Sequence, residues 1–160
     1  MRVSHLNINY GRSREECAIL KKTLGDAAPV KADSPSLNLH AYVRLDASGL
    51  SAGLMVPSDA WWDFNALMAD AGDIFALAKS ANPGLTLETP SWIQPEPLDT
   101  LDFGQWGRVM KSLQPGRHPF LLKITHGFGD NPIGFLASCR EPLISLFMAM
   151  KWKSPETNPI

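Results

Sequence analysis

The stretch around residue 50 constrains the fold most, because its side-chain pattern is that of a β-hairpin. Apolar and polar side chains alternate from Leu37 to Leu45, and the alternation resumes after the turn up to Val56. The turn at residues 46–49 has favourable chemistry, with Gly49 available for a positive φ. Alternation of this kind is typical of antiparallel strands that bury one face.

The other predicted elements alternate between strands and helices. A strand over residues 2–10 is followed by a helix with a capping box at Ser13 and Glu16, and a second helix and a short strand follow the hairpin. The resulting β-α-β-β-α-β order over residues 1–89 is that of the ferredoxin-like split βαβ fold. An α-β-α extension completes the α+β domain. The alternative is another α+β arrangement in which the last strand joins the sheet centrally.

Length and composition favour one cytoplasmic domain over residues 1–153, with a flexible tail at 154–160. The chain has 160 residues, 15 Lys plus Arg and 16 Asp plus Glu, for a net charge of −1. This balance lacks the positive charge of a non-specific nucleic-acid binder, so nucleic acid is not an expected partner. The N-terminus has no apolar leader and no window reaches ~18 apolar residues, so we expect no membrane span.

Neither the cysteines nor the histidines suggest a metal site. Cys17 and Cys139 form no C-x-x-C pair, and no two histidines have ligand spacing within one element. We therefore expect reduced, partly buried thiols, no metal and no cofactor. Four aspartates recur along the second predicted helix and are interpreted as its hydrated face; they are Asp59, Asp63, Asp70 and Asp73.

The segment at residues 120–132 concentrates the most chemistry, because it reads as a buried strand, a glycine-rich turn and a helix start. Asn131 is the predicted N-cap and Pro132 the first helical residue. Backbone N–H groups there can surround an anion. The candidate residues are His126 and Asp130 as catalytic groups, with Gly127, Gly129 and Asn131 as ligand-binding donors. Alternatively, the glycines only satisfy the turn geometry, Asp130 makes an Asx turn and His126 ends a strand.

A second candidate site is the polar side of the sheet. His5, Asn7 and Asn9 share one face of the first strand, and three residues of the hairpin share the corresponding face of theirs: His40, Tyr42 and Arg44. The latter three are predicted to bind a ligand, with a ring to stack on and one positive charge. In a ferredoxin-like sheet another strand would lie between these two, which leaves their direct contact open. The alternative is a solvated sheet face.

Tryptophan is abundant, with five residues in the chain. Neighbours on a helix are ~100° apart, so Trp61 and Trp62 cannot both point at the centre of one core face. Because tryptophan is enriched at binding hot spots, three residues are predicted to contact a partner: Trp62, Trp92 and Trp152. Alternatively, Trp62 packs under the proline-rich segment at 90–97. The stretch 143–152 is apolar on most sides, so it is buried in its own fold or against a partner.

These observations favour a protein-interaction or ligand-binding module over an enzyme, because no tight catalytic constellation is present. The expected partners are another protein or a second copy of the chain, with a small anionic ligand as a further candidate. The alternative function is a small-molecule enzyme, a hydrolase or transferase, that uses the turn from His126 to Asp130.

Overall fold

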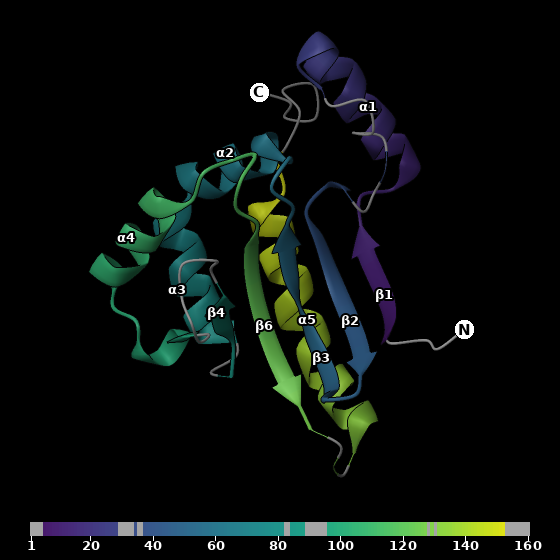
Figure 1. The fold of residues 1–160 in the computed structure, drawn as a ribbon, viewed down its shortest axis with the longest axis vertical. Coiled ribbons are helices and arrows are strands. Elements are labelled where there is room, and N and C mark those ends of the chain that lie inside the picture. Colours follow the sequence, from purple (N-terminus) through teal and green to yellow (C-terminus); the bar gives the residue numbers. More distant parts are fainter. Residues whose placement is uncertain are drawn as a thin grey trace.

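Six strands and five α-helices make up the described part of the chain (Figure 1). The computed structural model describes residues 5–28, 34, 37–81, 84–88, 96–127, 129 and 131–152, so the tail predicted at 154–160 lies outside it. The strands are β1 (His5–Gly11), β2 (His40–Asp46), β3 (Gly49–Val56), β4 (Thr86–Glu88), β5 (Glu96–Pro97) and β6 (Phe120–His126). The helices are α1 (Arg14–Leu24), α2 (Trp61–Ala69), α3 (Ala71–Ala81), α4 (Phe103–Ser112) and α5 (Pro132–Met150), with 3-10 turns η1 (Gly25–Ala27) and η3 (Leu98–Thr100).

The strands form one antiparallel sheet in the order β1-β2-β3-β6-β4-β5. The predicted hairpin is confirmed: β2 and β3 pair from Asp46↔Gly49 back to His40↔Met55. Gly49 has a φ of 134°, as the turn required. The capping box at Ser13 and Glu16 is also confirmed. The α+β class therefore holds.

The ferredoxin-like order over residues 1–89 is not confirmed. β1 pairs directly with β2, with no strand between them. The reason lies in α1, which a ferredoxin-like order needs as a crossover packed on the sheet. Instead α1 extends beyond one end of the sheet (Figure 1) and buries only Cys17 and Leu20. The chain therefore returns beside β1, and the first three strands form a meander.

The α4-β6-α5 extension is present, and its strand lies inside the sheet. β6 pairs with β3 on one side and with β4 on the other. This is the arrangement in which the last strand joins centrally, the alternative predicted from the sequence. Its burial fits the position, because Phe120 and Leu122 are fully buried.

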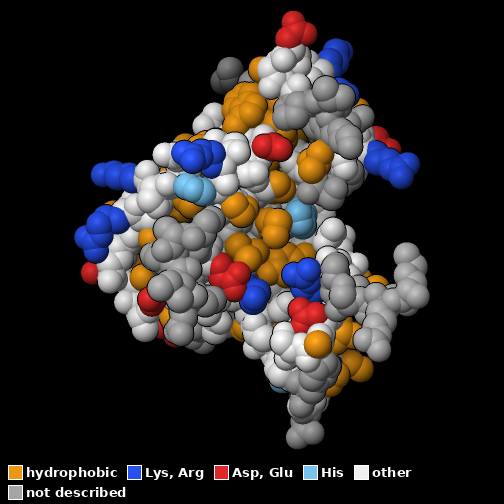
Figure 2. Space-filling model, in the orientation of Figure 1, with side chains coloured by type: hydrophobic (Ala, Val, Ile, Leu, Met, Phe, Trp, Pro, Cys, Tyr) orange, Lys and Arg blue, Asp and Glu red, His pale blue; other side chains and the backbone are white. Residues whose placement is uncertain are grey.

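The helices cover one face of the sheet. In Figure 1, α5 runs behind β2, β3 and β6, and α3 lies beside it. An aromatic stack joins α3, α4 and β6: the Phe75 and Trp106 rings are 5.0 Å apart, and the Trp106 and Phe120 rings are 5.9 Å apart edge to face. No described helix covers the opposite face, which is turned toward the viewer in Figure 2.

Candidate ligand-binding site on the open face of the sheet

The open face carries a cavity of about 350 Å³ built from five strands. Because β1 pairs directly with β2, Asn7 lies opposite Arg44 and Asn9 opposite Tyr42, so the predicted polar residues do come together. In Figure 2 hydrophobic side chains gather at the middle of this face, with His, Lys or Arg, and Asp or Glu side chains around them. The cavity is lined by Asn7, Asn9, His40, Tyr42, Arg44, Asp46, Ser48, Ser51, Met55, Glu88, Leu121, Lys123 and Thr125.

Tyr42 lines the cavity and lies across β3, where Gly53 makes room for it. A Cβ at Gly53 would lie 2.9 Å from the Tyr42 hydroxyl oxygen and 2.2 Å from the Leu122 carbonyl oxygen. Burial, and then the nearby Glu88 carboxylate, raise the pKa of the Tyr42 phenol well above its usual range. Tyr42 therefore stays a neutral hydroxyl that can donate a hydrogen bond.

Arg44 supplies a positive charge whose Nε–H has no hydrogen-bond acceptor among the described residues. Its Nε is buried and makes no hydrogen bond, and its cross-strand neighbours Asn7 and Ser51 are uncharged. Asp46, two residues along β2, accepts hydrogen bonds from the Ser48 N–H and hydroxyl at 2.8 and 2.5 Å. These bonds, and to a smaller extent the positive charge of Arg44, lower the pKa of Asp46. Among the described residues, Arg44 thus makes no ion pair, and a buried N–H without an acceptor is costly.

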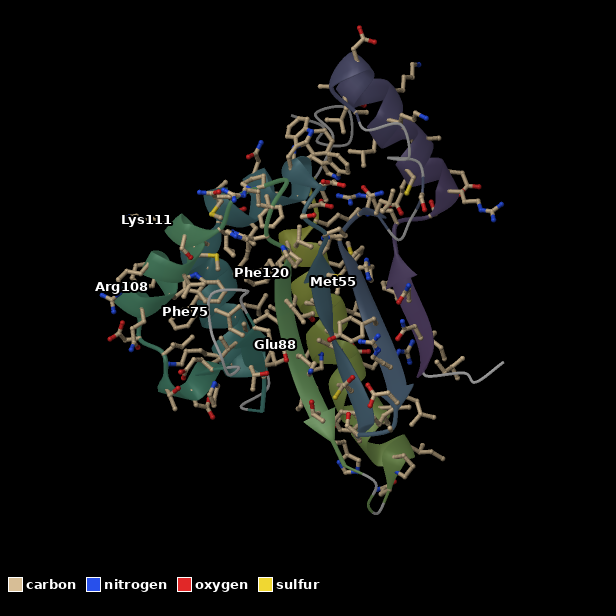
Figure 3. All side chains as sticks on the ribbon, in the orientation of Figure 1. Met55, Phe75, Glu88, Arg108, Lys111 and Phe120 are labelled. Atoms are coloured by element: carbon tan, nitrogen blue, oxygen red, sulfur yellow. The ribbon has the colours of Figure 1, made fainter. Side chains whose placement is uncertain are left out.

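The other cation of the cavity is compensated. Lys123 on β6 pairs with Glu88 on β4, with 2.9 Å between Nζ and Oε1. His40 is 7% exposed, and its Nδ1 lies 2.8 Å from the Asn38 carbonyl oxygen. Since a carbonyl only accepts, Nδ1 donates its N–H to this oxygen. Met55 and Leu121 add apolar surface between these groups; Met55 and Glu88 are labelled in Figure 3.

The glycine-rich turn lies apart from this cavity. Asn131 is the N-cap of α5, as predicted: its Oδ1 accepts the Gly134 N–H at 2.9 Å, and its φ of 63° is left-handed. The His126 ring stacks on Phe135 of α5 at 4.8 Å, on the helix-covered side, whereas its neighbour Thr125 lines the cavity. The other predicted residues of the turn are Gly127 and Gly129, both exposed, and Asp130, which lies outside the described residues. The catalytic role of this turn stays a prediction.

Two of the tryptophans predicted to contact a partner, Trp62 and Trp152, make hydrogen bonds within the fold. Trp62 is 1% exposed, and its indole N–H donates to Asn38 Oδ1 at 3.0 Å. The Trp152 backbone donates to Asp63 at 3.1 Å and accepts from Arg12 at 3.1 Å. Trp92 lies outside the described residues. A role in partner binding remains a prediction for all three residues.

A buried ion pair between Arg12 and Asp63 was missed by the sequence interpretation, which assigned Asp63 to a hydrated face. Asp63 is fully buried and accepts from Arg12 at 2.5 and 2.7 Å. The Leu39 N–H donates to the same carboxylate at 2.8 Å. One signal was available: Asp63 follows Trp62 and precedes Phe64, so it sits within an apolar run. The other three aspartates are exposed, as predicted.

Two features bear on metals and membranes. No group of three His, Cys, Asp or Glu side chains among the described residues could hold a metal ion. Helix α5 is long and apolar enough to cross a membrane by length and composition, but a core helix of a soluble protein passes the same test. In the structure α5 buries five side chains, Cys139 and Leu143 among them.

No known protein guides the interpretation of this cavity. A scan against protein-family models, a search of curated proteins and a search of solved structures each found no match for the chain. What the molecule does must therefore be inferred from its own residues.

Proposed function

We propose that the protein is a binding module for a small molecule that carries one carboxylate and an apolar body. The observation that carries this proposal is Arg44, whose buried Nε lacks a hydrogen-bond acceptor at the wall of a cavity. A carboxylate matches the guanidinium edge, because two parallel N–H groups meet two oxygens. The ligand would supply the acceptor that the described residues do not.

The rest of the cavity suits a monoanion better than a phosphate. Asp46 and Glu88 also line the cavity, and a ligand with two negative charges would be repelled by both. The apolar part of the ligand would rest on Tyr42, Met55 and Leu121. The Tyr42 hydroxyl, kept neutral by burial, would donate to a polar group beside the carboxylate.

Titration with sodium benzoate tests the proposal, since benzoate has one carboxylate and one apolar ring. The readout is the change of amide and arginine Nε–H signals in NMR spectra. We expect saturable shifts around Asn9, Tyr42 and Arg44. Arg44→Gln should weaken the binding by about tenfold or more, which is the size of one charge-assisted hydrogen bond.

Arg108→Gln is the matched control, because Arg108 is exposed on α4 (Figure 3) and does not line the cavity. It should bind benzoate as the wild type does. Titration with inorganic phosphate should give weaker shifts than benzoate. Equal benzoate affinity in the wild type and a folded Arg44→Gln variant would refute a role for the guanidinium. A wild-type spectrum that does not change on adding benzoate would refute the proposed ligand class.

A further inference from the structure

We propose that two copies of the chain pair through β1, antiparallel and around a two-fold axis at Ile8, so that their sheets become continuous. This inference does not rest on the ligand proposed above. β1 ends the sheet, and Figure 1 shows no described element beyond its outer edge. Edge strands are usually protected by a charge, a proline or a bulge. From Leu6 to Gly11 β1 has no charge and no proline, and its pairing with β2 runs without a bulge.

The backbone directions follow from the hairpin. The two-residue loop Ala47-Ser48 closes on the pair Asp46↔Gly49, and the closing pair of such a loop is hydrogen-bonded. Hydrogen-bonded and non-bonded pairs alternate along antiparallel strands. The even-numbered residues of β2 therefore bond β3, and its odd-numbered residues bond β1. In the β1–β2 register, the odd-numbered residues of β2 lie opposite Leu6, Ile8 and Tyr10, so the backbone groups of these three residues hydrogen-bond to β2. The backbone N–H and C=O groups of Asn7 and Asn9 therefore point toward the free edge.

These outward groups fit a second β1. With the axis at Ile8, Asn7 lies opposite the partner's Asn9, and Asn9 lies opposite the partner's Asn7. Both are the positions whose backbone groups are free to bond. Ile8 falls on the axis as a non-bonded pair with the partner's Ile8. A shift by one residue would set amide side chains against apolar ones on each face, and a shift by two would shorten the ladder.

The side chains are self-complementary in the same register. On the helix side, Leu6, Ile8 and Tyr10 are 58, 65 and 53% exposed, which is unusual for three apolar residues in one row. Pairing sets Leu6 against the partner's Tyr10, so apolar meets apolar along the strand. On the other side amides meet amides. None of the residues from Leu6 to Tyr10 that pair across the axis is charged, so no like charges oppose each other within this ladder.

An apolar groove continues this surface beneath β1. Its volume is about 320 Å³, and Ile8 and Tyr10 line it together with Leu136, Leu143 and Ile144 of α5; Arg140 is the one charged residue of the described lining. The Tyr10 ring also meets the Phe147 ring of α5 edge to face, with 5.5 Å between the ring centroids. Pairing would carry the apolar row of the second copy alongside it. On the open face, Asn7 and Asn9 line the ligand cavity, so the partner's Asn7 and Asn9 would extend the rim of each cavity.

Sedimentation equilibrium of the full chain tests the association. We expect a dimer for the wild type and a monomer for Ile8→Lys, which sets two ammonium groups against each other on the axis. The matched control is Ile133→Lys, because Ile133 is 79% exposed at the start of α5 and belongs neither to β1 nor to the groove beneath it. It should remain a dimer. A wild type that stays monomeric at high micromolar concentration overturns the proposal, as does an Ile8→Lys variant that stays dimeric.

Disulfide trapping tests the register and does not depend on the lysine variant. Non-bonded pairs place Cα atoms ~4.5 Å apart, within the range of a disulfide. Ile8→Cys should therefore form a covalent dimer on oxidation. Leu6→Cys should not, because four residues separate it from the partner's Leu6 along the strand, about 13 Å. The native Cys17 and Cys139 are buried. A dimer in which Leu6→Cys is trapped as efficiently as Ile8→Cys overturns the register.

Discussion

Replacing Asp63 by alanine should remove a large part of the stability of the fold. The Asp63 carboxylate accepts hydrogen bonds from the guanidinium of Arg12, a residue that is 4% exposed, and from two backbone N–H groups, those of Leu39 and Trp152. Breaking a buried ion pair by removing one partner costs about 3–5 kcal/mol, because the remaining charge is left uncompensated. Each backbone N–H left without an acceptor costs about 1–3 kcal/mol more, and this cost is smaller where water reaches the N–H.

We therefore expect Asp63→Ala to lower the free energy of unfolding by about 4 kcal/mol or more, out of a typical 5–15 kcal/mol for a domain. Urea unfolding followed by tryptophan fluorescence measures this, since Trp62 and Trp152 both contact the network. Asp73→Ala is the control: Asp73 is exposed in the first turn of α3, and its loss should cost at most about 1 kcal/mol.

A second variant separates charge burial from other effects of the substitution. Arg12→Met combined with Asp63→Leu removes both charges, so it should be more stable than Asp63→Ala although it alters more atoms. The reasoning is refuted if the free energy of unfolding of Asp63→Ala lies within about 1 kcal/mol of the wild-type value. It is also refuted if the double variant is the less stable of the two.

Two further predictions concern a glycine and a pH dependence. Gly53→Ala should lower the free energy of unfolding in urea by about 1–3 kcal/mol, because the added Cβ would lie 2.2 Å from the Leu122 carbonyl oxygen. The control is Gly107→Ala in α4, which should raise the free energy of unfolding because nothing lies within 4 Å of the added Cβ. Equal effects of the two substitutions would contradict the close approach at Gly53. Although burial opposes it, the hydrogen bond from Lys151 lowers the pKa of Glu16 below its ordinary 4.5. Its stabilisation is therefore present above pH 4.5 and lost as the pH falls through the folded pKa, so the difference in melting temperature between the wild type and Glu16→Gln should shrink on acidification; a constant difference would contradict this.

Local features could be predicted from the sequence, because short-range chemistry determines them. The hairpin from His40 to Val56, the capping box at Ser13 and the N-cap at Asn131 each depend on residues a few positions apart. The shared face of Tyr42 and Arg44 follows from the two-residue period of a strand.

Long-range pairings could not be predicted in the same way. Lys123 and Glu88 line the cavity because β6 lies between β3 and β4 in the sheet. Neither residue could be assigned to the cavity from the sequence, because no local pattern specifies the strand order. Asp63 is buried because Arg12, distant in sequence, meets it there. A periodic pattern records which face a residue occupies, and it carries no information on which distant group compensates a charge.

The central position of β6 has a consequence for synthesis of the chain. As residues leave the ribosome in order, β1, β2 and β3 can form their meander early, but the edge of β3 has no neighbour until Phe120–His126 emerges. β4, made long before, pairs with β6 and so cannot join the sheet sooner. During this interval the nascent chain presents two open strand edges, those of β1 and β3, and open edges invite aggregation. The strand that completes the middle of the sheet is therefore the last of its six described strands to be synthesised.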